Sequence, residues 1–357
     1  MKLPYITMLA ALLLTAPAAA QLQITPPATI PSTTPEKQKP KPPAPAKKEA
    51  APKPLASPKP APSAKPTPAP TVIPAPPTDN SNADLVYGAY QRGQYKTAFE
   101  LATARAQAGD PKAMTMLGEL YSNAMGIRRD YAKAAEWYKR AADAGDREAM
   151  FALAMLRISG RGGPVDKGEA VKLMASAAKL GEPRAAYNLA LLYLDGQTLP
   201  QDVKRSAELL RQAADAGLPE AQYALATFYK EGTGVPKDPE RAVRLLQAAS
   251  LADNVDAEVE YAIAMFNGTG TPKNQPAAVA LLRKASRQGS AIAQNRLAWV
   301  LINGVGTTMD KVEGFKWHLV AKTAGKGDPE LDKQLSDLPA EERTKAEAAA
   351  KKWLGNK

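Results

Sequence analysis

Small and apolar residues recur along this chain with a period of 36 residues. Glycine marks the period at positions 109, 145, 181, 217, 289 and 325, and Asp253 occupies the one remaining node. An alanine follows each of the first six nodes by four residues, from Ala113 to Ala293. A period of this length is typical of a solenoid, in which each unit contacts only its neighbours. The pattern therefore predicts an extended binding surface and no enclosed catalytic pocket.

Each unit is predicted to fold as two helices. In the unit that starts at Gly217, apolar residues lie at helical spacing from Pro219 to Tyr229 and again from Pro239 to Ser250. Gly232 interrupts the two runs, because glycine readily adopts the left-handed conformation that ends a helix. A short polar residue precedes each second helix as its predicted N-cap: Asp130, Asp166, Asp202, Asp238, Asn274 and Asp310. An alanine late in each second helix allows close helix contact: Ala141, Ala177, Ala213, Ala249, Ala285 and Ala321.

These columns carry a family resemblance. The pattern Ala113-xxx-Leu117-Gly118-xx-Tyr121, followed by Asp130-xxx-Ala134-xx-Trp137-Tyr138-xx-Ala141-Ala142-xx-Gly145, resembles the Sel-1-like repeat, a relative of the tetratricopeptide repeat. The resemblance implies an all-α fold, a right-handed superhelical solenoid of helix-turn-helix repeats over residues 81–325. It comprises a short first unit (83–108) and six full units (109–325), followed by a C-terminal capping helix within 326–357. Arg157 and Asp253 depart from the pattern, at a tyrosine and a glycine position respectively.

The N-terminal part has a different composition. Residues 1–20 are typical of a signal peptide, with Lys2, an apolar stretch and small residues up to Ala20; the alternative, an uncleaved anchor, is disfavoured by Pro17. We therefore expect a location in the periplasm or outside the cell. Residues 21–80 are rich in proline, alanine and lysine and are predicted to be a disordered linker. The linker has a net charge of +5, and the whole chain has a net charge of +11. The linker's charge suits either weak contact with anionic surfaces or simple solvation, and we favour solvation.

Candidate chemistry is sparse. The chain has no cysteine and a single histidine, His318, so it lacks the residues for a thiolate site, a histidine-based metal site or a serine-histidine triad. His318 stands in a column of apolar residues and is interpreted as a packing residue. The Gly232-Thr-Gly234 loop has no downstream Gly-Lys-Ser/Thr, so it does not resemble a nucleotide loop. We expect no catalytic residue, cofactor, metal site or nucleic-acid partner, and no transmembrane segment after removal of the signal.

The candidate site is a ribbon on the first helices. In repeats of this kind the first helices line the concave side, and three positions on each lie off the packing column. Apolar and aromatic side chains predominate there, and the proposed partner-binding residues are Phe151, Tyr187, Leu194, Tyr223, Phe266 and Trp299. The alternative is that a tightly coiled solenoid buries these side chains between successive first helices, and the sequence leaves both interpretations open.

The repeats, the signal-peptide pattern and the sparse chemistry are compatible with three functions. The first is a periplasmic scaffold or adaptor that binds envelope proteins or peptides, as the resemblance implies. The second is a regulator that restrains a sensor kinase from the periplasmic side, as some exported bacterial Sel-1-like proteins do. The third, disfavoured by the lack of catalytic residues, is an enzyme that acts on the cell wall. The sequence names neither the partner nor the oligomeric state.

Overall fold

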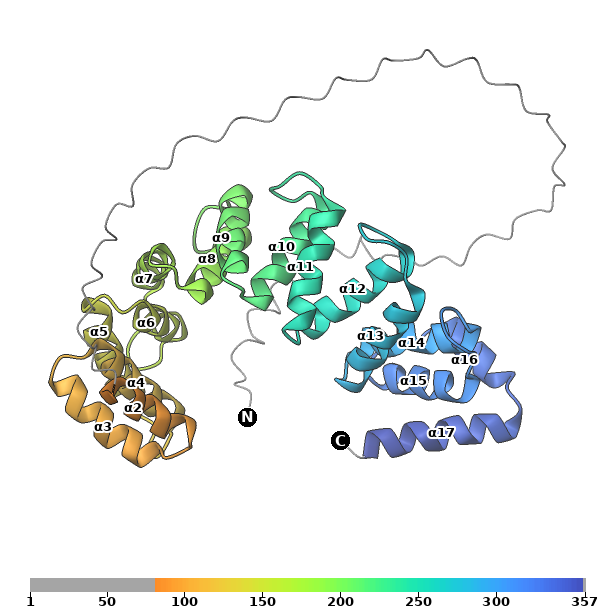
Figure 1. Cartoon of the computed structure of the whole chain (residues 1–357), viewed down its shortest axis with the longest axis horizontal. Coiled ribbons are helices and arrows are strands. Elements are labelled where there is room, and N and C mark those ends of the chain that lie inside the picture. Colours follow the sequence, from red (N-terminus) through yellow and green to blue (C-terminus); the bar gives the residue numbers. More distant parts are fainter. Residues whose placement is uncertain (1–80, 356–357) are drawn as a thin grey trace, which may run out of the picture. The chain divides into compact units, whose positions relative to one another are not determined.

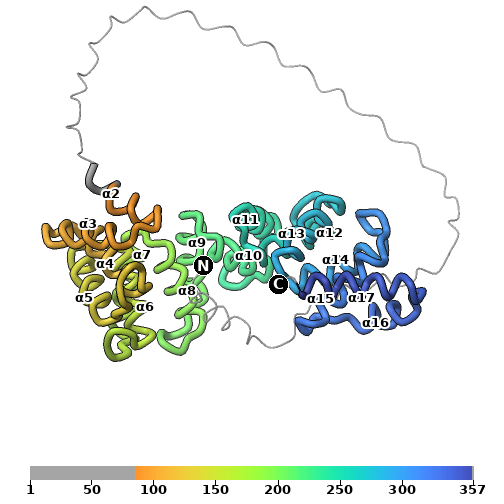
Figure 2. Tube along the Cα trace, turned by 90° about the horizontal axis from the view of Figure 1, so that it is seen from below, coloured from red at the N-terminus to blue at the C-terminus, as the bar shows by residue number. Residues whose placement is uncertain are grey.

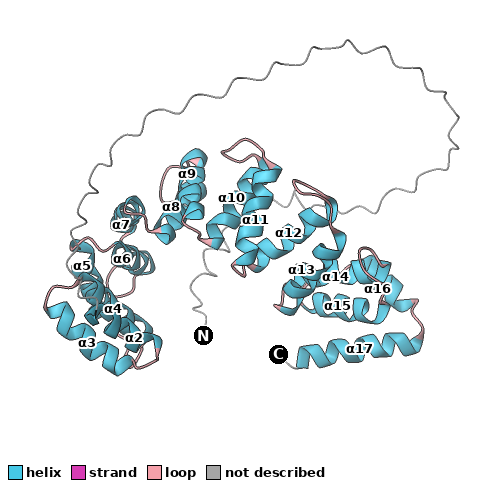
Figure 3. Ribbon diagram, viewed as in Figure 1, coloured by secondary structure: helices cyan, strands magenta, loops and turns pink. Residues whose placement is uncertain are grey.

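A computed structural model describes residues 81–355 of the chain. This part contains sixteen α-helices and no strand (Figures 1 and 3). The prediction of an all-α fold is therefore confirmed. The predicted signal peptide (1–20) and linker (21–80) lie outside the described residues.

The helices follow the predicted pairing. The short first unit consists of α2 (Ser81–Gln91) and α3 (Tyr95–Gln107). The first helices of the six full units are α4 (Pro111–Asn123), α6 (Arg147–Ser159), α8 (Pro183–Asp195), α10 (Pro219–Glu231), α12 (Val255–Asn267) and α14 (Ala291–Asn303). The second helices are α5 (Tyr131–Asp143), α7 (Lys167–Lys179), α9 (Val203–Asp215), α11 (Pro239–Leu251), α13 (Gln275–Arg287) and α15 (Lys311–Thr323). The segment expected to hold one capping helix contains two, α16 (Pro329–Ser336) and α17 (Ala340–Gly355).

Side-chain caps fix where the second helices begin. The Asp202 and Asp238 carboxylates each accept a hydrogen bond, 2.9 Å long, from the backbone N–H three residues later. Such a bond satisfies one of the N–H groups that a helix leaves unpaired at its start. All six predicted N-caps form this bond, which confirms the sequence assignment. Most first helices end at a glycine in the left-handed conformation, such as Gly232 with φ of 81°.

The core runs along the stack between adjacent helices. Each first helix packs against the second helix of its own unit, and each second helix packs against the first helix of the next. The predicted small-residue columns lie at these contacts. The alanines from Ala113 to Ala293 are at most 3% exposed, and those from Ala141 to Ala321 are fully buried. Small side chains thus let the helix backbones approach closely in every unit.

The C-terminal helices close the stack on α15. Figure 2 shows α17 running beside α15, and the rings of Trp317 and Trp353 meet edge to face with centroids 5.0 Å apart. His318 is fully buried, and its Nε2 lies 2.8 Å from a carboxylate oxygen of Asp332 on α16. The only histidine thus packs at the end of the stack. None of the helices within residues 81–355 has the length and apolar character needed to cross a membrane.

Candidate functional site

We define the first-helix face as the three predicted positions on each of α6, α8, α10, α12 and α14. Its residues are Phe151, Met155 and Ile158; Tyr187, Leu191 and Leu194; Tyr223, Thr227 and Lys230; Val259, Ile263 and Phe266; Asn295, Trp299 and Ile302. Three of them, Leu191, Val259 and Ile302, are buried, so at these points the face is core. The other twelve are half-buried, including all six residues proposed for partner binding. That the face is concave stays a prediction.

Three of the aromatic residues contact other side chains of the face or its edge. The guanidinium of Arg184, on α8, lies over the ring of Phe151, on α6, 5.1 Å from its centroid. The Phe266 and Trp299 rings meet edge to face with centroids 6.5 Å apart, across α12 and α14. These contacts link successive units. A partner that displaced Arg184 would find a preformed aromatic surface beneath it.

Tyr187 and Tyr223 lie in an environment that is both apolar and acidic. Burial raises the pKa of Tyr187, and the negative charge of Glu220 raises it further. The pKa of Tyr223 is raised mainly by burial and then by the charges of Glu260, Asp256 and Glu231. Both phenols therefore stay protonated at neutral pH and can donate a hydrogen bond. Leu194 lies further along α8, half-buried and packed against the core.

Few of these carboxylates are neutralised. Glu260 pairs with Lys230 at 2.9 Å, which joins α12 to α10. Among the described residues, no basic side chain lies within ion-pair distance of Glu220 or Asp256. Burial raises the pKa of Asp256, and the nearby charge of Glu260 raises it further. The middle of the first-helix face is therefore acidic.

A rim of five polar residues, at the C-terminal ends of the first helices, could bind a peptide backbone and is partly engaged within the protein. Asp195, Glu231, Asn267 and Asn303 are exposed, whereas Asn123 is half-buried. The Asn303 amide donates a hydrogen bond of 2.8 Å to the backbone oxygen of Trp299, one turn earlier. Four of the five rim residues are thus accessible to a partner, and one of these already makes a local bond.

The first full unit, which the predicted face leaves out, differs from the others. The same three positions on α4 hold Thr115, Glu119 and Ser122, so here the face is polar. Burial raises the pKa of Glu119; the charge of Arg184 opposes this effect and that of Glu148 adds to it. These three positions on α4 could have been identified from the sequence, because the 36-residue period relates them to the face; Glu119, for example, precedes Met155 by one period.

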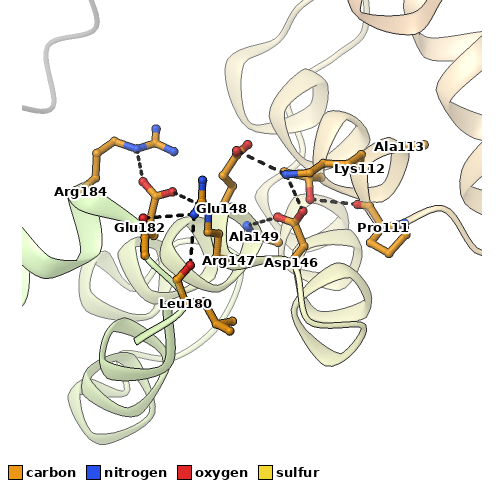
Figure 4. Close-up of polar contacts among 12 residues, drawn as sticks. Pro111, Lys112, Ala113, Asp146, Arg147, Glu148, Ala149, Leu180, Glu182 and Arg184 are labelled. Atoms are coloured by element: carbon orange, nitrogen blue, oxygen red, sulfur yellow. Dashed lines mark hydrogen bonds and ion pairs between the residues drawn. The ribbon is translucent and has the colours of Figure 1, made fainter. Parts of the chain in front are cut away.

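A charged ladder crosses the N-terminal ends of α4, α6 and α8 (Figure 4). The Lys112 ammonium lies 2.9 Å from Asp146, the buried N-cap of α6, and 3.4 Å from Glu148. Burial lowers the pKa of Lys112, but its bonds and charge interactions with these carboxylates outweigh burial, so the pKa is raised. One period on, Glu182 pairs with Arg147 at 3.9 Å and with Arg184 at 2.7 Å.

The ladder connects successive units. Arg147 also donates to the backbone oxygens of Leu180 and Gly181 in the next unit. Because Lys112 and Arg147 each reach one unit forward, the ladder fixes the register between units. No group of acidic or histidine side chains suited to a metal ion is found within residues 81–355.

The repeat pattern decides the family. Sel1 repeats match residues 111–146, 147–182, 183–218, 219–254, 255–290 and 291–326. The chain belongs to the Sel1 repeat family. The matched units begin two residues after the nodes of the 36-residue period, at the first residue of each first helix.

Solved structures agree with this assignment. The chain is similar to a Sel1 repeat protein from Oxalobacter formigenes, with 27% identity and a TM-score of 0.61 over 67% of this chain and 98% of that one. It also shares the fold of a protective antigen present in uropathogenic Escherichia coli strains, which displays an SLR fold. That structure is 23% identical, with a TM-score of 0.52 over 78% of this chain and 68% of the antigen. No curated protein sequence matches the chain.

Proposed function

We propose that this protein is an exported scaffold whose first-helix face binds an extended segment of an envelope protein. Sel1 repeat proteins are protein–protein interaction scaffolds, and the repeat solenoid is typically non-catalytic. The observation that carries the proposal is the pair of tyrosines on successive first helices. Tyr187 and Tyr223 are half-buried, keep their hydroxyl groups protonated and lie beside carboxylates of which, within residues 81–355, only Glu260 has a basic partner, Lys230. Tyrosines of this kind are enriched among residues that dominate binding energy.

Truncating the two tyrosines tests the proposal. A Tyr187→Ala, Tyr223→Ala variant should lose its envelope partner, because truncating one anchor typically costs more than about 2 kcal/mol, or about 30-fold in affinity. Bait protein immobilised at equal density would be exposed to solubilised envelope, and captured proteins would be compared by quantitative mass spectrometry. Tyr131→Ala is the matched control, since Tyr131 is also half-buried but lies on α5.

Helical content and cooperative melting must be retained in both variants for the comparison to hold. If the double variant unfolds, the two tyrosines belong to the core and the proposal is wrong. If it folds and captures the same partner as strongly as the wild type, the binding surface lies elsewhere.

Export is tested separately. The signal-peptide pattern ends at Ala20, so the mature protein purified from the source cell should begin at Gln21. N-terminal sequencing after osmotic release of the periplasm measures this directly. A protein that retains Lys2 and stays in the cytosolic fraction would contradict export while leaving the binding proposal intact.

A further inference from the structure

One unit boundary of the first-helix face shows how a cation can be held there. The Arg184 guanidinium, on α8, lies 5.1 Å from the centroid of the Phe151 ring on α6, and its Nε lies 2.7 Å from a carboxylate oxygen of Glu182. The ring attracts the cation by its negative face, and the carboxylate by a charge-assisted hydrogen bond. Arg184 follows Phe151 by 33 residues, so the repeat identifies the equivalent positions at the next boundaries.

At the next two boundaries a carboxylate replaces the cation beside the ring. Glu220 follows Tyr187 by 33 residues, and Asp256 follows Tyr223 by 33 residues. After burial, the charge of Glu220 contributes to the raised pKa of Tyr187, and that of Asp256, after burial and Glu260, contributes to the raised pKa of Tyr223. Each carboxylate therefore lies close to its tyrosine. Neither has a basic partner in the described part of the chain, so ring and carboxylate are both present without a cation.

The last first helix, α14, carries the opposite charge. Arg296 is half-buried, and no carboxylate within residues 81–355 lies within ion-pair distance of it. Burial lowers the pKa of its guanidinium, although the charges of Asp328 and Glu260 act against burial. Both carboxylates are engaged elsewhere, because Glu260 pairs with Lys230 and Asp328 accepts a hydrogen bond at the start of α16. Arg296 is thus a partly desolvated cation without a counter-charge.

The unmatched charges are held partly out of water. The Oε2 atom of Glu220 and the Nε atom of Arg296 are both closed to solvent, and neither has a hydrogen-bond partner among the described residues. Such groups are unfavourable in the free protein, and part of the desolvation that binding requires has already taken place. Arg296 also precedes Trp299 by three residues, so the two side chains are neighbours on α14 beside the face. A partner that supplies the missing charges would therefore gain more than on an exposed surface.

The repeat also sets the spacing of the charges that a partner must supply. The ring contact of Phe266 with Trp299 shows that successive first helices approach to side-chain distance. Packed helices lie about 10 Å apart, and an extended chain advances about 3.3 Å per residue. Side chains of an extended ligand that meet successive first helices would therefore be about three residues apart.

We propose that the first-helix face binds an extended peptide segment that places basic side chains on the Tyr187–Glu220 and Tyr223–Asp256 pairs and an acidic side chain on Arg296. The inference rests on the proposed function of this face and specifies the charge pattern of the partner. The two basic residues lie about three positions apart, and the acidic residue lies about three positions beyond them. A basic residue on either pair reproduces the ring-and-carboxylate contact that the protein itself forms with Arg184.

Selection from a library of random peptides displayed on phage tests this pattern. The peptides need about twelve residues to span four first helices, and the immobilised protein is the full chain. We expect the retained peptides to be enriched in Lys or Arg at two positions and in Asp or Glu at a third, with the spacing given above. Arg296→Gln should abolish the acidic preference alone. Glu220→Gln with Asp256→Asn should abolish the basic preference alone.

Matched controls lie on the second helices. Arg244→Gln on α11 removes an exposed cation, and Glu208→Gln with Asp215→Asn on α9 removes two exposed carboxylates. These variants should retain both preferences. Selection of no peptide, or of peptides whose charge preferences are the same on the wild type and on the face variants, would overturn the inference.

The affinity of one selected peptide gives the coupling at Arg296. Replacing the acidic residue of the peptide by its amide should weaken binding to the wild type about fivefold or more, as measured by fluorescence anisotropy, and should leave binding to Arg296→Gln almost unchanged. Arg296→Gln should also melt no earlier than the wild type, because it removes a partly buried charge that has no partner. Earlier melting would show that Arg296 has a counter-charge within the fold, which would contradict the inference.

Two outcomes separate this inference from the proposed function. If the selected peptides require Tyr187 and Tyr223 but show no charge pattern, the inference fails and the proposed function stands. If the charge pattern depends on Glu220, Asp256 and Arg296 while capture of the envelope partner is independent of the two tyrosines, the proposed function fails and the recognition of the charge pattern stands.

Discussion

Replacing Lys284 with alanine should lower the free energy of unfolding by about 2–3 kcal/mol. Its ammonium, on α13, pairs with the fully buried carboxylate of Glu258 on α12 and lies 2.8 Å from Asp253. Removing one partner of a buried ion pair leaves the other charge buried without compensation, which typically costs about 3–5 kcal/mol. The expected cost is lower here because the Lys284 side chain is 42% exposed and water reaches it.

The repeat itself supplies the control variant. One period before and after Glu258 stand Gln222 and Gln294, whose amides donate to the backbone oxygens of Ala214 and Ser286, eight residues earlier. Glu258→Gln restores this repeat residue and places an amide near the equivalent oxygen of Ser250. We therefore expect Glu258→Gln to change stability by no more than about 0.5 kcal/mol.

Urea denaturation of the two single variants and the double variant completes the cycle. The double variant should be more stable than Lys284→Ala alone, because no buried charge is left unpaired.

The stability deficit of Lys284→Ala should also depend on pH. The Asp253 and Glu258 carboxylates raise the pKa of Lys284, and their effect outweighs the slight desolvation that lowers it. A pKa that is higher in the folded than in the unfolded state stabilises the fold at pH values below the unfolded-state pKa. This stabilisation is lost as the pH rises through the folded-state pKa. The deficit of Lys284→Ala should thus be constant from about pH 6 to 9 and shrink above about pH 10.4. Equal stability of Lys284→Ala and wild type at pH 7 would contradict this account.

The fold was largely predictable because its determinants are local and repeated. The cap at Asp238, the left-handed glycine at Gly232 and the small residue Ala221 each act within one helix or one contact, and the 36-residue period repeats them. The role of Asp253, by contrast, could not be predicted from the 36-residue period alone. It keeps the left-handed conformation of the glycines, with φ of 59°, and its carboxylate contacts Lys284, 31 residues later.

The candidate site was less predictable because it depends on contacts between units. Helical spacing placed Phe151 and Trp299 on the same face, but the contact of Arg184 with Phe151 depends on how α8 stacks on α6. The burial of Leu191 and the exposure that remains at Tyr187 likewise depend on how closely neighbouring first helices approach. Sequence periodicity gives the register of a side chain within its own helix but not the tilt between helices.

Replacing Gly270 with alanine should lower the free energy of unfolding by about 3 kcal/mol. Gly270 lies in the loop between α12 and α13 with φ of 68°, a conformation that costs a non-glycine residue about 1–2 kcal/mol. A Cβ atom there would also overlap the carbonyl group of Pro239, the first residue of α11 in the preceding unit. Backbone atoms cannot move aside as a side chain can, and overpacking of this kind costs a further 1–3 kcal/mol or so.

Gly217→Ala separates the two contributions. Gly217 also has a positive φ, 85°, but a Cβ atom added there would meet no atom within 4 Å. This variant should therefore show only the conformational cost, about 1–2 kcal/mol. Urea denaturation followed by circular dichroism measures both variants against the wild type. If Gly270→Ala and Gly217→Ala destabilise equally, the loop does not press on α11, and the units must be held together by their helix contacts and by ion pairs such as those of the charged ladder.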